Sequence, residues 1–216
     1  MVKDTVFNLS FQDYFERMMP QVSFQEQLVV VDLDDSVTKE DKVGRYPMRL
    51  EASSLVVVLS GEMSIEVDYL PYTLKPHTVM QLLADNIIGN VVHTSDFSAY
   101  LILFSPELKQ EIMSLTSGIR FPKAGNLKRL YPEQMLTDDE CGIAVNRIER
   151  IKQYIADTTH LYRSTIIKNE VINLLLDITN SRWKTYGERE VSFSRNEIIR
   201  QRFHELLLEN CRKRRA

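Results

Sequence analysis

Residues 55–67 read Leu-Val-Val-Val-Leu-Ser-Gly-Glu-Met-Ser-Ile-Glu-Val, and this stretch decides the expected fold class. It contains two short apolar runs, Leu55–Leu59 and Met63–Val67, on either side of Ser60-Gly61-Glu62. A glycine at the centre of so short a connection supplies the positive φ that a tight turn between strands needs. The stretch therefore predicts two β-strands joined as a hairpin.

Similar runs occur on both sides of this stretch, between residues 22 and 104. Turn signals such as Asp68–Pro71 and Lys75-Pro76-His77 separate them. Many short strands at close spacing predict a β-sandwich or small barrel rather than βαβ units. Some runs are apolar at every position, as in Leu55–Leu59, so we expect later helices or a partner to cover their outer faces. The other predicted strands are Leu28–Leu33, Tyr72–Leu74, Val79–Leu83, Ile87–Val92 and Tyr100–Phe104.

The pattern becomes helical after Ser105. Pro106 occupies a position suited to a first helical turn. Thr137-Asp-Asp-Glu140 and Ser194-Arg-Asn-Glu197 are capping boxes, and each predicts the start of a helix. A short amphipathic helix is also predicted at Ser10–Met19. The sequence thus predicts an α+β protein with a strand-rich part (1–105), a helical part (106–193) and a final helix (194–216).

The overall composition is that of a soluble globular protein: 216 residues, 44% hydrophobic, with a net charge of −3. This charge excludes electrostatic binding of nucleic acid by the chain as a whole. The two cysteines, Cys141 and Cys211, form no CxxC pair, which favours a reducing compartment and argues against a Cys-rich zinc site. No apolar run is long enough for a signal peptide or a membrane span, so we expect a cytoplasmic protein without membrane contact.

Signatures of enzymatic chemistry are sparse. A cupin-type metal site needs three convergent ligands, commonly an HxH pair followed by a glutamate, but the strand-rich part holds only His77 and His93. The sequence also contains no GxSxG, GxxxxGK[ST] or GxGxxG motif. Cys141, in the first turn of a predicted helix, is interpreted as a structural thiol. We expect no catalytic residue, no metal, no cofactor and no enzyme activity.

An apolar stripe lies along the helix predicted at about Leu161–Trp183. The stripe has two interpretations that can both hold: it packs on the sheet or the preceding helix, or it extends into a dimer seam. We assign dimerisation to it, because a short β-domain would not cover all the apolar faces of residues 138–183. The stripe consists of Ile167, Val171, Leu174 and Ile178.

Four segments resemble, in the same order, motifs of one known family. Tyr46–Leu50 (YPMRL) is similar to a YPFRL strand, and Leu59–Asp68 (LSGEMSIEVD) to an L-x-G-x-x-x-I-x-V-D hairpin. Ser95–Ser105 (SDFSAYLILFS) is similar to S-D-F-x-G-Y-x-I-x-x-S, with Ala99 in place of the usual glycine. Phe203–Arg215 resembles a helix that leads into two helix-turn-helix units. With these segments the chain resembles the sensor domain of AraC-type transcription regulators, especially the group common in Bacteroides-like bacteria.

The resemblance implies a cupin-like β-barrel or jelly roll that binds a small-molecule effector, followed by helices that pair two subunits into a homodimer. Residues 1–105 would be the effector-binding barrel with an N-terminal arm, and 106–193 the dimerisation region. Residues 194–216, with the basic Arg212–Arg215, would be a linker helix. DNA would be bound only through a further C-terminal domain, which we expect to lie outside this sequence.

For the effector site, the resemblance points to strand residues that include polar groups able to orient a ligand. Because both faces of several strands are apolar, the sequence does not define which of these side chains point inward. The predicted ligand-binding residues are Tyr46, Met48, Arg49 and Tyr100.

Two other functions remain open. A metal-dependent cupin enzyme would require bound Fe, Mn or Zn. A cyclic-nucleotide-binding regulator also combines a β-roll with a long helix, but it needs a Gly-Glu phosphate cassette followed by an arginine. Gly61-Glu62 lies in a predicted turn with no such arginine after it. The sequence favours the effector-sensing and dimerisation portion of an AraC-type regulator over both.

Overall fold

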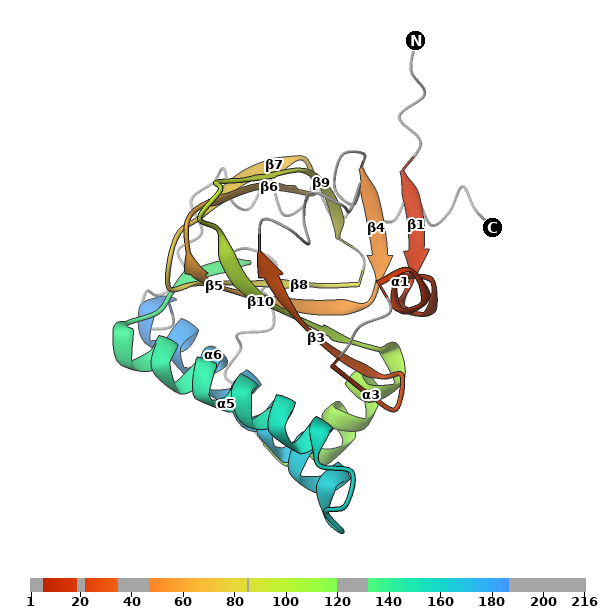
Figure 1. The fold of residues 1–216 in the computed structure, drawn as a ribbon. Coiled ribbons are helices and arrows are strands. Elements are labelled where there is room, and N and C mark those ends of the chain that lie inside the picture. The colour runs from red at the N-terminus through yellow and green to blue at the C-terminus, as the bar shows by residue number, and fades with distance from the viewer. Residues whose placement is uncertain (1–5, 19–21, 35–46, 85, 120–131, 187–216) are drawn as a thin grey trace.

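The computed structural model describes residues 6–18, 22–34, 47–84, 86–119 and 132–186. In these residues two β-sheets face each other, and two long helices cover the outer side of one of them (Figure 1). The predicted α+β class, a cupin-like sandwich followed by helices, is confirmed.

The two sheets are mainly antiparallel. Sheet A has the order β1-β4-β9-β6-β7 and sheet B the order β11-β8-β5-β10-β3-β2. Only the β1–β4 pair among the described strand pairs is parallel. The strands of sheet A are β1 (Phe7–Ser10), β4 (Met48–Glu51), β9 (Ile87–His93), β6 (Met63–Val67) and β7 (Leu70–Leu74). Those of sheet B are β11 (Glu133–Met135), β8 (Thr78–Leu82), β5 (Ser53–Ser60), β10 (Ser98–Phe104), β3 (Leu28–Asp34) and β2 (Ser23–Phe24).

The turn at Gly61 has the predicted conformation, with a φ of +65°. The two strands that it joins are nevertheless not paired with each other. β5 pairs with β8 and β10 in sheet B, whereas β6 pairs with β7 and β9 in sheet A. The prediction that these two strands pair as a hairpin is therefore wrong. The turn at Gly61 instead carries the chain from sheet B to sheet A, and we call it the corner of the sandwich. Strand β6 instead forms a hairpin with β7, where Asp68 and Tyr69 both have positive φ.

Both faces of strand β5 are buried, as its continuous apolar sequence predicts. Val56 and Val58 point between the sheets, and Leu55 and Val57 point towards the helices. Alternate residues of a strand face opposite sides, so a strand covered on both faces needs an apolar residue at every position. The expectation that later helices cover the outer face is confirmed.

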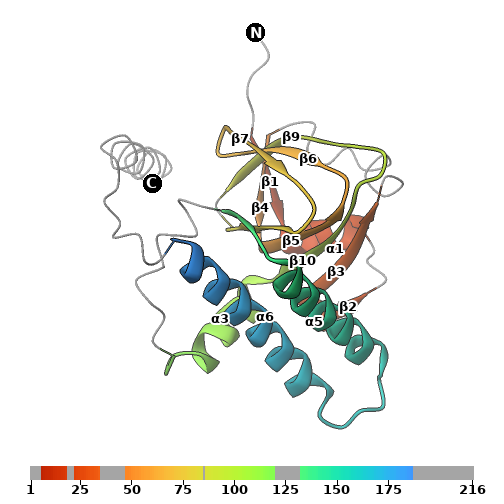
Figure 2. The same ribbon diagram turned by 90° about the vertical axis from the view of Figure 1, so that its left-hand side faces the viewer.

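Helices α5 (Asp138–Ala156) and α6 (Arg163–Tyr186) lie side by side across sheet B, with α3 (Pro106–Leu115) beside α6 (Figure 2). The short helix α1 (Phe11–Met18) packs at one end of the sandwich. The capping box that begins α5 is confirmed: the Thr137 hydroxyl accepts the Glu140 N–H, and the Glu140 carboxylate accepts the Thr137 N–H. The second predicted box, at Ser194, lies outside the described residues.

Candidate functional site

The space between the sheets is occupied by two clusters of apolar side chains. One joins β5, β8 and β10 of sheet B to β6 and β7 of sheet A, and the other includes α1. Met63 and Met80 belong to the first cluster and Met48 to the second. Methionine side chains are flexible and polarisable, so they can rearrange around an inserted apolar group. The chemistry of this interior suits the apolar part of a ligand.

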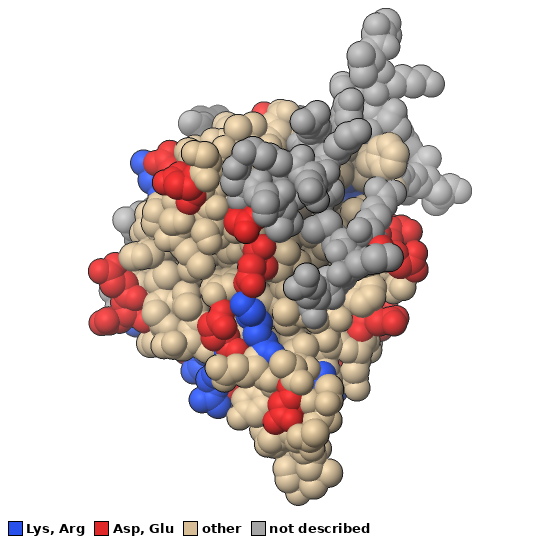
Figure 3. Space-filling model, viewed as in Figure 1, with Lys and Arg blue, Asp and Glu red and all other residues tan. Residues whose placement is uncertain are grey.

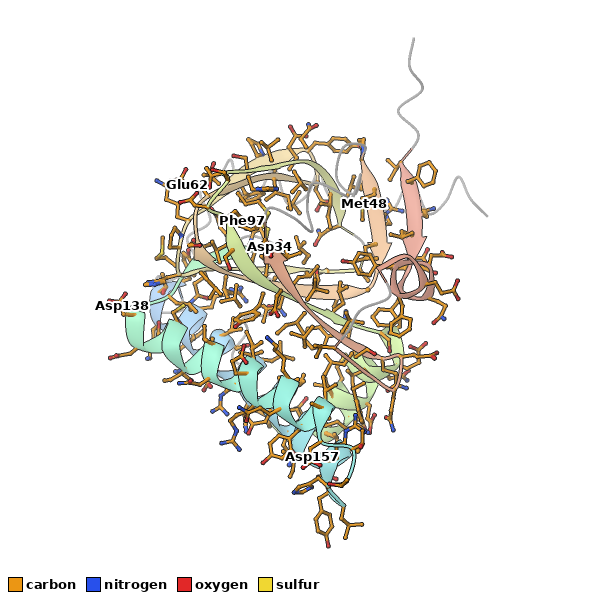
Figure 4. The ribbon with its side chains drawn as sticks, in the orientation of Figure 1. Asp34, Met48, Glu62, Phe97, Asp138 and Asp157 are labelled. Carbon is orange, nitrogen blue, oxygen red and sulfur yellow. The ribbon has the colours of Figure 1, made fainter. Side chains whose placement is uncertain are left out.

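The three predicted ligand residues that the structure describes do not meet in one place. Met48 points into the interior from β4, where Figure 4 labels it. Arg49 lies between two inward-facing residues, so its side chain is on the outer side of sheet A. Tyr100 faces helix α5 on the outer side of sheet B, and Tyr46 lies outside the described residues. Ligand binding by these residues stays a prediction, but Met48, Arg49 and Tyr100 do not line a common pocket.

A small hollow lies on the outer face of sheet A, close to the strand position of Arg49. The space inside it that a water molecule can occupy is about 10 Å³. Binding pockets for drug-sized ligands generally exceed roughly 300 Å³, so this hollow is too small for one. Its lining residues are Pro47, Glu66, Tyr69, Ile87 and Gly89.

A polar cluster joins sheet B to α5, and we call it the sheet–helix cluster: Asp32, Tyr100, Glu149 and Lys152. The Tyr100 hydroxyl donates to Glu149 Oε1 at 2.5 Å. Lys152 Nζ lies 3.0 Å from both carboxylate oxygens of Asp32 and 3.1 Å from Glu149 Oε1. The same ammonium is 5.1 Å from the centre of the Tyr100 ring, within cation–π range. Strands β3 and β10 are thus both attached to one turn of α5.

The ionisation of these groups reflects their mutual contacts. Burial, followed by the hydrogen bond to Glu149, raises the pKa of Tyr100 to about 12. The same hydrogen bond is the main cause that lowers the pKa of Glu149. Burial opposes the charge on Lys152, but the hydrogen bonds with Asp32 and Glu149 outweigh it and raise the pKa of the ammonium. At neutral pH Tyr100 is therefore a neutral phenol, Glu149 a carboxylate and Lys152 an ammonium.

The four residues predicted for dimerisation lie inside a single chain. Ile167, Val171, Leu174 and Ile178 are 1%, 0%, 0% and 2% exposed, and they pack in one cluster with α5 and sheet B. A second copy cannot reach them unless the helix pair opens. The first interpretation, packing within the chain, therefore holds, and the assignment of the stripe to dimerisation stays a prediction.

Ion pairs hold α5 and α6 together beside this stripe. Arg147 Nη1 lies 3.1 Å from Glu170 Oε2, and Arg150 Nη2 lies 2.9 Å from the other oxygen. Arg147 Nε also donates to Asp177 at 2.6 Å. Glu170 is only 6% exposed, so two guanidinium groups compensate a nearly buried charge. The helix pair is thus built as one unit.

Several residues with polar roles were not predicted from the sequence. Asp32, Glu149 and Lys152 have no motif, because their partners come from other elements. Arg182 did carry a signal: it follows Ile178 by four residues and continues the buried stripe, where a charge is unexpected. Cys141 is 5% exposed, and burial raises the pKa of its thiol, which agrees with a structural role.

Within the described ranges, no three His, Cys, Asp or Glu side chains are grouped so that they could hold a metal ion. The helices described there also lack the combined length and apolar character that crossing a membrane requires. On the face shown in Figure 3, acidic and basic side chains of the described residues are interspersed rather than gathered into one basic surface.

No protein-family profile and no curated protein matches the sequence. Among solved structures, the chain is similar to the AraC-like transcriptional activator CuxR, with 14% identity and a TM-score of 0.39 over 69% of this chain. It is also similar to apo ToxT from Vibrio cholerae, with 9% identity and a TM-score of 0.46 over 78% of this chain. A RmlC-like cupin from Shewanella frigidimarina has 18% identity and a TM-score of 0.29, covering 38% of this chain and 69% of the cupin.

The chain spans 49% of the length of the CuxR chain and 60% of the ToxT chain. At these identities and TM-scores the likeness concerns the fold and carries no argument about activity.

Proposed function

We propose that this chain is the effector-sensing and dimerisation portion of an AraC-type transcription regulator, acting in the cytoplasm as a binding protein and not as an enzyme. The support is a contact between two of the resembling segments, at the end of the sandwich where Figure 4 labels Glu62 and Phe97. A Cβ on Gly61 would lie 2.6 Å from Phe97 Cα and 2.6 Å from Thr94 Oγ1. Ser60 Oγ donates to the Asp96 carbonyl at 2.7 Å.

The glycine of one motif and the Ser-Asp-Phe of the other thus fit each other physically. One packing requirement explains the glycine of the first motif, since a side chain at position 61 would collide with backbone atoms of the second. This supports the resemblance as a structural one.

In this proposal the sheet–helix cluster passes a change in the barrel to the helices. An effector that displaces β3 or β10 pulls on Asp32 or Tyr100, and these hold Lys152 and Glu149 on α5. The effector biases such a two-state equilibrium only by its different affinity for the two states, typically about 1–3 kcal/mol.

The dimer surface would be the exposed side of the helix pair. Ile143 on α5 is 47% exposed and Trp183 on α6 is 37% exposed. Large apolar side chains at a subunit interface lose their contact with water, which favours pairing. The other exposed large apolar residues in the described part of 106–193 are Met113, Leu115, Ile119, Met135, Leu161 and Tyr162.

The test measures the molar mass of the chain by light scattering over a concentration series, followed by a fusion to a DNA-binding domain that represses a reporter only as a dimer. The proposal expects a dimer in solution and repression by the fusion. A strict monomer that leaves the reporter unrepressed would contradict the dimerisation role. Stoichiometric Fe, Mn or Zn in the purified protein would instead favour a cupin enzyme.

A further inference from the structure

The guanidinium group of Arg182 is almost fully buried, yet only one of its three nitrogens has a hydrogen-bond partner in the described residues. Arg182 lies just before the last turn of α6 and is 1% exposed. Its Nη1 donates to Oε1 of Gln81 on β8 at 3.1 Å. Its Nε and Nη2 are also buried, and neither has a hydrogen-bond partner in the described part of the chain. Burial lowers the pKa of Arg182 to about 10, so the group still carries its charge at neutral pH.

The two unpartnered nitrogens, Nε and Nη2, lie on the same edge of the guanidinium group. Nε–H and the outer N–H of Nη2 point in parallel directions from the planar guanidinium. This fork matches the two oxygens of a carboxylate, which accepts both hydrogen bonds at once. A buried charge without a compensating anion is strongly unfavourable, whereas a bidentate carboxylate would neutralise it and accept both protons.

Two polar groups of the neighbouring region, Glu140 and Ser181, are engaged with other partners. Glu140, in the first turn of α5, accepts from Ser181 Oγ at 2.8 Å and pairs with Lys184 Nζ at 3.2 Å. Ser181 in turn accepts from Nε2 of Gln134 on β11 at 2.5 Å. This chain of hydrogen bonds leaves Gln134 Oε1 buried without a partner in the described residues, a second unpaired polar atom in this region.

We propose that the junction between the end of α6 and strand β8 is a binding site for a small carboxylate, held by the Nε and Nη2 edge of Arg182. Gln81 orients the guanidinium through Nη1, so the opposite edge is presented to the ligand. The site lies on the helix side of sheet B and is separate from the apolar interior between the sheets. It goes beyond the proposed function, because carboxylate binding here does not require the chain to regulate transcription.

A ligand reaches the site if the end of α6 moves. The three residues after Arg182, namely Trp183, Lys184 and Thr185, are exposed, so the described part of the chain does not enclose the last turn of α6. Helix ends open at lower free energy than helix interiors. A monocarboxylate fits better than phosphate, because one guanidinium compensates one negative charge and a phosphate dianion would need a second cation.

The experiment titrates the purified chain with acetate, benzoate, octanoate and inorganic phosphate, and measures binding by calorimetry and by the rise in melting temperature. A ligand that binds only the folded state raises the melting temperature as its concentration increases. Arg182→Lys keeps the charge but loses the fork, and Arg182→Met removes the charge. Lys184→Met, two residues along and exposed, is the matched control.

We expect saturable binding of at least one carboxylate by the wild type and by Lys184→Met, and weaker or no binding of phosphate. Arg182→Lys should weaken this binding roughly tenfold or more, and Arg182→Met should abolish it. On the wild-type protein, the NMR signal of Arg182 Nε–H should shift and become protected from exchange when the carboxylate is added. Three results would each overturn the proposal: no binding of any carboxylate, equal binding of phosphate, or unchanged affinity in Arg182→Met.

Discussion

The ammonium group of Lys152 on α5 lies 3.0 Å from both carboxylate oxygens of Asp32 on β3. The two residues are separated by 120 positions in the sequence, and nothing local predicts their contact. Lys152 also reaches Glu149, which holds the Tyr100 hydroxyl of the neighbouring strand β10. Sheet B and the helix pair are therefore joined by a charged contact as well as by apolar packing.

The first prediction concerns the strength of this contact. In a double-mutant cycle of Asp32→Asn and Lys152→Met, we expect a coupling free energy of about 0.5–1 kcal/mol in urea unfolding. The value is small because the side chain of Asp32 is 62% exposed and solvent screens the pair. The pair Lys75–Glu62 is the control: its atoms are 3.7 Å apart and both side chains are more than half exposed, so its coupling should be smaller still. A larger coupling in the control pair would contradict this ranking.

The second prediction concerns Tyr100 and alkaline pH. Its pKa of about 12 in the folded chain is above the ordinary value of 10.0, so folding favours the protonated phenol. The resulting stability is fully present below pH 10 and is lost as the pH rises through the folded-state pKa. The ultraviolet absorbance of tyrosinate, compared between wild type and Tyr100→Phe, measures this titration. Glu149→Gln should lower the pKa of Tyr100, but the pKa should stay above the ordinary value of 10.0 because the phenol is still partly buried. Ionisation of Tyr100 at its ordinary pKa in the wild type would refute the prediction.

The third prediction separates the two interpretations of the apolar stripe. Val171 is 0% exposed within one chain, so Val171→Asp should destabilise the fold by roughly 3–5 kcal/mol. Asn173→Asp, two residues away and exposed, should change the free energy of unfolding by less than about 0.5 kcal/mol. Urea unfolding with circular dichroism measures both. If Val171→Asp gave a well-folded monomer of normal stability, the stripe would be a dimer seam after all.

The fourth prediction concerns the corner at Gly61. Gly61→Ala forces a non-glycine residue into a φ of +65° and places its Cβ 2.6 Å from Phe97 Cα. We expect a loss of about 2 kcal/mol or more, because the colliding atom belongs to the backbone and cannot rotate away. Gly142→Ala is the matched control: it lies in helix α5 and its Cβ would meet open space, so it should stabilise the chain by up to about 1 kcal/mol. A neutral Gly61→Ala would show that the corner can rearrange.

Local chemistry made much of the fold predictable. The Thr137–Glu140 capping box and the turn at Gly61 depend on residues within a few positions of one another, so the sequence contains all their causes. The short strands β1, β2 and β11 were not predicted, because runs of two to four residues have no recognisable periodicity and exist only through their pairing. Strand β4 was indicated only by the resemblance.

The candidate sites were less predictable than the fold. Tyr100 was chosen from a strand motif, but which face of β10 it occupies depends on register, and a shift of one residue reverses it. Its partner Glu149 lies 49 positions away on α5. Arg182 was not predicted as a site residue, although a charged residue at a position that continues a buried apolar stripe is unexpected.

The sequence by itself determined the types of the longer elements, most of their boundaries and the double-sided burial of β5, because these follow from turn residues, caps and apolar spacing. Only the tertiary structure decided that β5 and β6 belong to different sheets. It also decided that the Ile167–Ile178 stripe is buried within one chain and that the side chain of Arg182 is buried. The reason is physical: local patterns define which surfaces must be buried, but the partner that buries each surface is selected by the packing of the whole chain.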